Sequence, residues 1–267
     1  MKTVLTGSNK KRRWRDALYP VATVVAVVAV WELIVRAADV PAYLVPAPSA
    51  IALAFVSDFG LIASHARATM FEAAVGLSLS VAIAFGVAML MDNFPAVRKA
   101  LYPLLIMSQT APVIAVAPIL IIWFGFGALP KVVIVVLMCF FPICVSLTDG
   151  FAETDKDFLD YFHLIKATRL QVYRHLKIPH ALPYFFAGLK IAVTYTVMAA
   201  VIAEWLGGNE GIGVYMLRAK QSFALDRMFA AIALVVAVSL ILIALVDLAA
   251  RRVVYWKAGA GEGGVGE

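Results

Sequence analysis

Long apolar stretches alternate with short polar segments along this chain. A membrane-spanning helix needs about 20 mostly apolar residues, and the chain has six stretches of this kind, at 18–38, 68–91, 101–124, 131–148, 183–206 and 228–250. The pattern predicts an all-α membrane protein with six transmembrane helices. It divides the chain into a basic N-terminal segment 1–17, a transmembrane domain 18–250 and a glycine-rich tail 251–267.

The composition excludes most soluble classes. Of 267 residues, 63% are hydrophobic and 15% are charged, and the mean hydropathy is +0.90. A soluble domain is about 45–50% apolar and about 25% charged, so a soluble globular enzyme, a disordered chain and a disulfide scaffold are excluded. The two cysteines, Cys139 and Cys144, lie in one apolar run at a spacing that suits neither a disulfide nor a metal site. We therefore expect no metal ligands in this chain.

The basic residues are distributed unevenly between the two sides of the predicted bundle. The formal net charge is +6, which in a soluble protein would suggest a nucleic-acid partner. With the N-terminus inside, most of the 23 Lys and Arg residues fall in segment 1–17, the connection 149–182 and the tail 251–267. The positive-inside rule then predicts that both termini and this connection are cytoplasmic. The charge thus indicates a multi-pass protein of the cell membrane with the lipid bilayer, and no nucleic acid, as partner.

The connection 149–182 has a helical pattern of its own. Phe158, Phe162 and Ile165 recur at helical spacing among charged residues, which predicts a short amphipathic helix. Two interpretations stay open for this element: a helix that rests on the membrane surface, or a docking surface for a cytoplasmic partner.

A second helix is expected in the same connection. Thr168, followed three residues later by Gln171, is typical of a capping box and predicts a helix that starts at Thr168. Pro179 and Pro183 are expected to end it. One apolar face of this helix would carry Leu170, Tyr173 and Leu176.

A set of short motifs extends over most of the chain. It comprises Trp31-Glu32, Pro46-Ala47-Pro48-Ser49, Ile119 to Gly127, Phe140-Phe141-Pro142, Pro179 to Leu189, and the longer stretch from Tyr173 to Gly213. Together these motifs resemble the permease subunits of ABC importers, in the branch that transports nitrate, sulfonates, taurine and thiamine-precursor pyrimidines. The residues of these motifs are more similar to those of the pyrimidine transporters than to those of the sulfonate transporters.

This resemblance implies a type I importer permease: six transmembrane helices with a cytoplasmic helical coupling loop, here 149–182. Two permease copies, expected to be a homodimer, would form the pathway. An extracytoplasmic substrate-binding protein would deliver the solute, and closure of cytoplasmic ATP-binding subunits would drive alternating access. The chain has no phosphate-binding motif of the G-x-x-x-x-G-K-[S/T] type. It is therefore expected to be no enzyme and to bind no cofactor, with ATP and Mg²⁺ on the partner.

The family's cytoplasmic motif is matched in spacing but not in every residue. Asp160-Tyr161-Phe162 stands at its Glu-Ala-Ala, Lys166 at its Gly, and Pro179 closes it. A Gly would allow a sharp break between two helices, so Lys166 must make that break, or the break moves next to Thr168. The match implies an ATPase-docking loop. Its apolar face would consist of Phe162, Ile165, Ala167, Leu170 and Tyr173, and its polar rim of Asp160, Arg169 and Arg174. Lys166, Thr168 and Pro179 would mark its helix boundaries.

Polar residues inside the spans are candidates for the translocation pathway, because such groups usually face the bundle interior or a cavity. The candidates are Ser108, Gln109 and Thr110 in the third span, Thr194 and Tyr195 in the fifth, and Glu204 near its outer end. Hydrogen bonding between helices is the alternative role. Lys190, the one deeply placed basic residue, is expected to extend to the interface.

A secondary transporter driven by an ion gradient is the alternative function. It would need internal repeats and acids at mid-membrane depth. The sequence has no convincing repeat, and its acids lie near the ends of the predicted spans.

Overall fold

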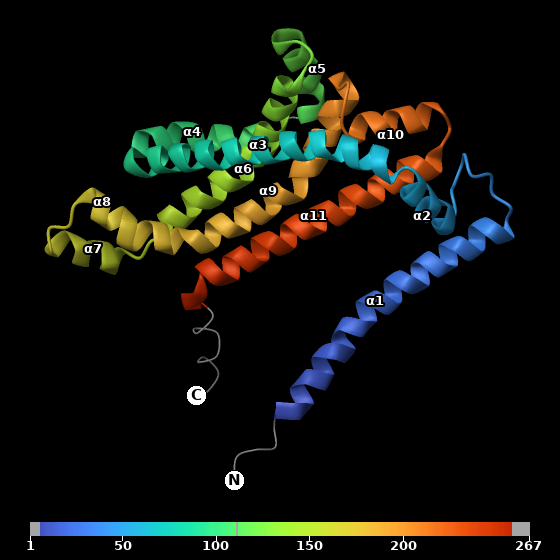
Figure 1. Cartoon of the computed structure of the whole chain (residues 1–267). Coiled ribbons are helices and arrows are strands. Elements are labelled where there is room, and N and C mark those ends of the chain that lie inside the picture. The colour runs from blue at the N-terminus through green and yellow to red at the C-terminus, as the bar shows by residue number, and fades with distance from the viewer. Residues whose placement is uncertain (1–5, 111, 258–267) are drawn as a thin grey trace. The chain divides into compact units, whose positions relative to one another are not determined.

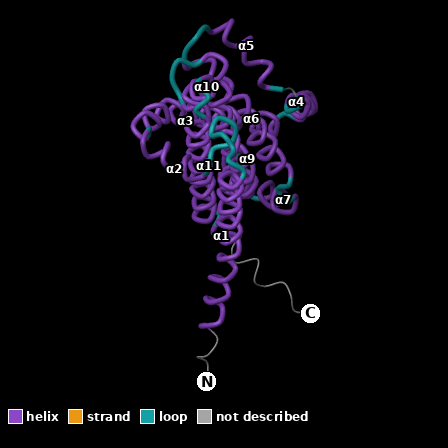
Figure 2. Tube along the Cα trace, turned by 90° about the vertical axis from the view of Figure 1, so that its right-hand side faces the viewer, coloured by secondary structure: helices purple, strands orange, loops and turns teal. Residues whose placement is uncertain are grey.

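The computed structural model describes residues 6–110 and 112–257, and all of its regular elements are helical (Figures 1 and 2). The α-helices are α1 (Thr6–Ala37), α2 (Pro48–Ser57), α3 (Phe59–Asn93), α4 (Pro95–Ser108), α5 (Val113–Phe124), α6 (Ala128–Ala152), α7 (Lys156–Leu164), α8 (Arg169–Val172), α9 (Ile178–Gly207), α10 (Ile212–Gln221) and α11 (Leu225–Val253). A π-helical segment, Tyr173–Lys177, joins α8 to α9, and a 3₁₀ turn, Tyr255–Lys257, follows α11.

Five helical stretches in the described part are long and apolar enough to cross a membrane. They are Tyr19–Ala37, Phe59–Asn93, Ala128–Ala152, Arg169–Gly207 and Leu225–Val253. The pair α4 and α5 passes the same test together and gives a sixth if it counts as one span. The prediction of an all-α membrane protein is confirmed.

The third expected span, 101–124, is not one helix. The axes of α4 and α5 are bent by 101° at the break between them. Pro112 stands at the N-cap of α5 with φ −70° and ψ 102°, and it lacks the N–H that would continue the ladder of α4. The polar run before it thus lies at a helix break instead of in a continuous span.

Two short helices and an extension were not expected. The connections 39–67 and 207–227 contain α2 and α10, and α3 starts at Phe59, nine residues before the expected 68. With ten residues each, α2 and α10 are too short to span a bilayer, so a pattern of span-length apolar stretches does not indicate them. The basic side chains of 10–15 and most of the tail 251–267 lie outside what the structure describes.

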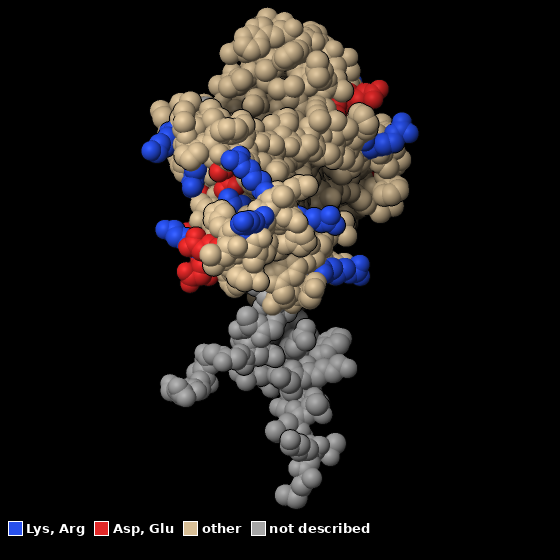
Figure 3. All heavy atoms as spheres, turned by 90° about the vertical axis from the view of Figure 1, so that its left-hand side faces the viewer, with Lys and Arg blue, Asp and Glu red and all other residues tan. Residues whose placement is uncertain are grey.

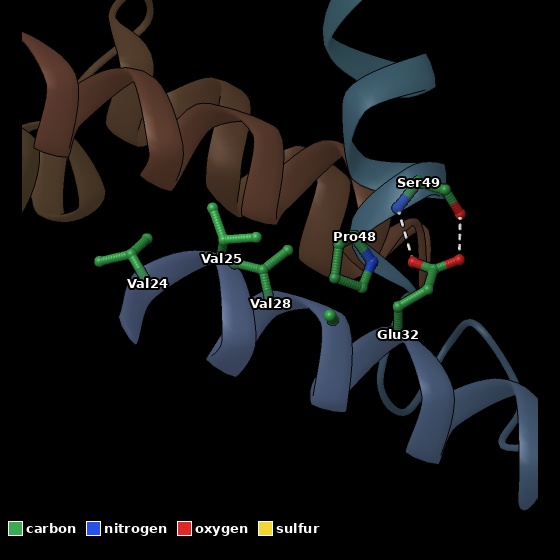
Figure 4. A pocket seen from close by; sticks show the side chains of 7 residues that line it. Val24, Val25, Val28, Glu32, Pro48 and Ser49 are labelled. Carbon is green, nitrogen blue, oxygen red and sulfur yellow. Dashed lines mark hydrogen bonds between the residues drawn. The ribbon is translucent and has the colours of Figure 1, made fainter. Parts of the chain in front are cut away.

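The described residues form two compact units: 6–60 with 216–232, and 61–110 with 112–215 and 233–257. In the first unit, Glu32 of α1 accepts hydrogen bonds from the backbone N–H (3.0 Å) and hydroxyl (2.7 Å) of Ser49 at the start of α2 (Figure 4). An anionic group at a helix N-terminus compensates unpaired N–H groups there. The groove beside this contact is lined by three valines and an alanine of α1, together with Glu32, Pro48 and Ser49. Two motifs distant in sequence, Trp31-Glu32 and Pro48-Ser49, therefore form one contact.

In the second unit, α6 and α9 pack along each other at small residues (Figure 1). A Cβ on Gly188 would lie 2.6 Å from the carbonyl oxygen of Pro142 and 2.8 Å from Oγ of Ser146. α3 packs on α6 in the same way, because a Cβ on Gly76 would lie 2.5 Å from Cγ1 of Val135. Such small-residue contacts let helix backbones approach closely in membranes.

We expect Gly188→Ala to lower the free energy of unfolding by about 2 kcal/mol, because the added methyl group overfills the α6–α9 contact. Gly86→Ala is the matched control: a Cβ at Gly86 of α3 meets no atom within 4 Å, and alanine is the better helix former. Thermal unfolding of both variants in detergent measures the difference. Equal midpoints for the two variants would contradict the close packing of α6 on α9.

Candidate functional site

The helices α7 and α8 lie together at one end of the second unit, at the left of Figure 1. Asp155 caps α7, since its carboxylate accepts the N–H of Asp157 at 2.9 Å. The break between the helices is at Lys166, whose φ is +53°. Thr168 caps α8 in a complete capping box with Gln171. The expected break and the expected cap are both confirmed.

We expect Lys166→Gly to stabilise the turn between α7 and α8 by about 0.5–1 kcal/mol, because a side chain at positive φ costs about 1 kcal/mol and glycine has no such cost. His163→Gly, on exposed helix α7, is the control and should destabilise by a similar amount. Amide hydrogen exchange across residues 161–171 measures both. Faster exchange in Lys166→Gly would show that the turn is not strained.

The prediction that Pro179 and Pro183 end the second helix is wrong. The helix continues from Arg169 to Gly207. The wider π-turn Tyr173–Lys177 precedes the first proline, and the N–H of Ile178 bonds to the carbonyl of Tyr173, five residues back. A π-turn changes the register of the backbone bonds, so the proline, at the start of α9, is accommodated without a break.

Large apolar side chains are exposed on α7, α8 and the turn between them. Leu164 is 82% exposed and Leu170 is 76% exposed. Tyr161 and Ile165 are exposed as well, and we call these four residues the α7–α8 surface. Leu164 and Tyr161 were not among the expected docking residues, because the spacing argument started from Phe158 and Phe162. Exposed apolar groups in this number indicate a surface that the membrane or another molecule covers.

The other expected docking residues surround this surface. Phe162, Ala167 and Pro179 are half-buried, whereas Asp160, Lys166, Thr168, Arg169 and Arg174 are exposed. Figure 3 views the molecule from this end and shows several Lys and Arg side chains and fewer acidic ones. Among the expected docking residues, the charged ones are thus Asp160 and the three basic residues Lys166, Arg169 and Arg174.

Tyr173 differs from its expected place on the docking face. It is 8% exposed, its ring packs edge-on against Phe151 at 5.9 Å, and its hydroxyl bonds to Asp92 of α3. Lys177 also donates to Asp92, at 2.7 and 2.9 Å. The π-turn directs Tyr173 inward, away from the side of Leu170, so the predicted common face of these two residues is not formed.

A buried polar cluster lies at the other end of α9. Glu204 is 1% exposed and accepts hydrogen bonds from the hydroxyl of Thr69 (2.7 Å) and from the N–H of Gly213 (2.6 Å). Thr69 in turn accepts the N–H of Ile212 at 2.8 Å. The first N–H groups of a helix have no acceptor within that helix. In α10, side chains of α3 and α9 supply these acceptors.

Glycine is required in the turn that leads into this cluster. Gly211 has φ +121°, and a Cβ there would overlap the carboxyl group of Glu204. Its N–H donates to Nδ1 of His65 at 3.1 Å. The glycine-rich segment after α9 therefore makes a tight turn against a carboxyl group.

A buried ion pair lies beside the cluster. Lys131, in the first turn of α6, is 6% exposed and pairs with Glu72 of α3, which is 3% exposed. From the sequence, the acids were expected near the ends of the spans, and no partner was expected for Glu72 or Lys131. A lysine inside an apolar stretch needs a partner when it is buried, and that rule could have indicated an acid on another helix.

The expected pathway residues are divided by the structure. Ser108, Gln109 and Thr110 are exposed around the α4–α5 break, and Thr194 and Tyr195 are exposed on α9. Glu204 is separate from both groups and is buried in the cluster above. A role of these residues in a pathway stays a prediction. Lys190 is half exposed and pairs with Asp247 of α11 at 2.9 Å.

Comparisons with known proteins identify the class. Residues 76–255 match the family of binding-protein-dependent transport system inner membrane components. The formylaminopyrimidine transport permease protein ThiX of Halalkalibacterium halodurans is 37% identical over 83% of this chain and 88% of its own length. The riboflavin transport system permease protein RibX of Chloroflexus aurantiacus is 30% identical over 94% of both chains. A putative aliphatic sulfonates transport permease protein, SsuC of Bacillus subtilis, is 26% identical over 93% of this chain and 90% of its own.

This chain belongs to the family of binding-protein-dependent transport system inner membrane components. It is a multi-pass permease subunit of an ABC transporter, in the branch that the sequence motifs indicated. Membership in this family implies an ATPase and a substrate-binding protein as partners. The relatives are transport subunits and not enzymes, and the family gives no support to the alternative of a secondary transporter.

Proposed function

We propose that this permease imports a small heteroaromatic solute, with a thiamine-precursor pyrimidine favoured over a sulfonate, nitrate or taurine. The permease ThiX is named for formylaminopyrimidine transport. A second observation comes from the charges. Lys190 and Lys131, two of the basic residues within the described spans, are both paired, with Asp247 and Glu72. Neither ammonium group is then available to hold an anionic solute.

The exposed polar residues on α9 and at the α4–α5 break suit the same substrate class. Gln109 offers an amide, Thr194 a hydroxyl, and Tyr195 a ring that is 41% exposed. An amide can pair with ring nitrogens and amino groups, and an aromatic ring can stack on a planar heterocycle. In the proposed pathway these three residues, together with Ser108 and Thr110, line the route, and Glu204 holds the turn at its outer end.

The α7–α8 surface is the proposed docking site of the ATP-binding subunit. The proposal that ATP hydrolysis drives transport rests on this surface. Leu164 and Leu170 would enter an apolar groove of that subunit, and Arg169 and Arg174 would face its acidic rim. Both termini and this surface lie in the cytoplasm in this proposal, and two copies of the chain form the pathway. ATP and Mg²⁺ are bound by the partner, and closure of two ATPase subunits moves the two α7–α8 surfaces together.

Reconstitution tests this function. The permease, its ATP-binding subunit and its substrate-binding protein are placed in proteoliposomes, and uptake of labelled formylaminopyrimidine, taurine, nitrate and riboflavin is compared. We expect uptake of the pyrimidine only with hydrolysable ATP and the binding protein present. Uptake that an ion gradient drives without ATP would overturn the proposal, and preferred uptake of an anion would overturn the substrate class.

A further inference from the structure

The helices α3 and α9 are tied together at both ends. At one end Asp92 of α3 binds Lys177 and Tyr173, in the turn that leads into α9. At the other end Thr69 of α3 binds Glu204 of α9. At 1.5 Å per residue, the two ties are roughly 35–40 Å apart. The two helices therefore form a frame that extends from the α7–α8 end to the turn before α10.

The tie at Asp92 is mostly shielded from water. The side chains of Lys177 and Asp92 are 17% and 11% exposed. Both carboxylate oxygens accept from the ammonium group, and the hydroxyl of Tyr173 donates to one of them. A charge-assisted pair of this kind is stronger than a neutral hydrogen bond, and removal of one partner leaves a buried charge unpaired.

Asp92 is also a residue that α3 by itself does not favour. It lies in the last turn of α3, where the helix dipole disfavours an acid, and this turn contains no basic residue. The stabilisation of its charge therefore comes from the turn Tyr173–Lys177 and not from its own helix. Asp92 thus serves the contact between α3 and this turn.

The α7–α8 end has few other attachments. α7 has no buried residue in the structure, and Leu170 of α8 is exposed. A force on this end reaches α6 through the connection 153–155 and the contact of Tyr173 with Phe151. It reaches α9 through the continuous helix Arg169–Gly207, and the contacts of Tyr173 and Lys177 with Asp92 carry it directly to α3.

We propose that Asp92 is a positioning residue for transport: it makes α3 follow α9 when the α7–α8 surface moves, so that the frame moves as one body. Through Thr69 and Glu204 the same movement reaches the turn before α10. This inference rests on the proposed function, because the driving movement is that of a docked ATPase. Without the tie, α9 moves and α3 lags, and ATP is hydrolysed with less solute transported.

The test measures solute transported per ATP hydrolysed in the reconstituted complex. Asp92→Asn and Lys177→Met remove the ion pair, and Tyr173→Phe removes only the tyrosine hydrogen bond. The matched control is Tyr102→Phe, which removes a tyrosine–aspartate bond of 2.8 Å to Asp149 that joins α4 to α6 and does not touch α3 or α9.

We expect Asp92→Asn to lower the ratio at least fivefold while ATP hydrolysis stays within twofold of wild type, and Tyr102→Phe to leave the ratio unchanged. The exchange Asp92→Lys with Lys177→Asp should recover at least half of the loss. An unchanged ratio in Asp92→Asn, or an equal fall in Tyr102→Phe, would overturn the proposal.

The same set of variants distinguishes a role of the Asp92 contact in folding from a role in transport. If Asp92→Asn does not assemble, the ratios of Lys177→Met and Tyr173→Phe decide in its place. Failure of all three to assemble, with Tyr102→Phe intact, would assign the tie to folding and overturn the transport role. If the wild-type complex transports no solute, the proposed function fails before any variant is compared.

Discussion

Replacement of both Leu164 and Leu170 by alanine is expected to weaken binding of the ATP-binding subunit about 100-fold. The two side chains are 82% and 76% exposed, and full burial of a leucine side chain is worth about 1.5–3 kcal/mol. A loss of about 3 kcal/mol corresponds to about a factor of 100 in Kd. Titration of the permease in nanodiscs with the purified ATPase subunit measures the change.

The matched control replaces Leu240 and Leu245 of α11, which are 60% and 55% exposed in a membrane-spanning helix. The same two changes there should leave ATPase binding intact. Because Leu164 and Leu170 have few packing partners, the test variant should keep its helical circular dichroism and its unfolding midpoint. Wild-type affinity in Leu164→Ala/Leu170→Ala would show that the ATPase docks elsewhere.

Glu204→Ala is expected to destabilise the permease by about 3 kcal/mol. The change removes the acceptor of Thr69 and of the Gly213 N–H, and each buried donor left without a partner costs about 1–3 kcal/mol. The cavity left by the side chain adds to this loss. The unfolding midpoint in detergent should fall accordingly, and amide exchange in the first turn of α10 should become faster.

Two variants make the result specific. Glu210→Ala removes an exposed glutamate only six residues away and should have little effect. Glu204→Gln keeps the volume and one acceptor oxygen, so it should lose less stability than Glu204→Ala. If Glu204→Ala is as stable as Glu210→Ala, the carboxyl group does not hold the turn.

Local patterns predicted the parts of this protein that depend on neighbouring residues. The apolar runs gave the spans, because a bilayer imposes a minimum length on each helix. Thr168 and Gln171 gave the helix start, because a capping box is made by residues three apart. The spacing of the family's motif indicated a break at Lys166 or next to Thr168, and the structure has it at Lys166, at positive φ.

The sequence-based predictions were wrong where a distant contact or a change of helix register determined the structure instead of the neighbouring residues. Pro179 ends an isolated α-helix by rule, but a π-turn before it keeps the chain helical. The same turn moved Tyr173 from the expected surface into the contact with Asp92. The pairing of Glu72 with Lys131 was not expected, because the sequence does not show that two charges 59 positions apart will meet.

The sequence by itself determined the class of this protein and five of its spans, because each depends on composition, length or spacing within a few residues. It also indicated the loop that is proposed to meet an ATPase. Only the tertiary structure decided which polar residues hold the helices together and which stay exposed. The contacts of Asp92 with Lys177 and of Thr69 with Glu204 bring together side chains 85 and 135 positions apart. No periodicity encodes such pairs, since they exist only when helices pack and the cost of burying each polar group is met by its partner.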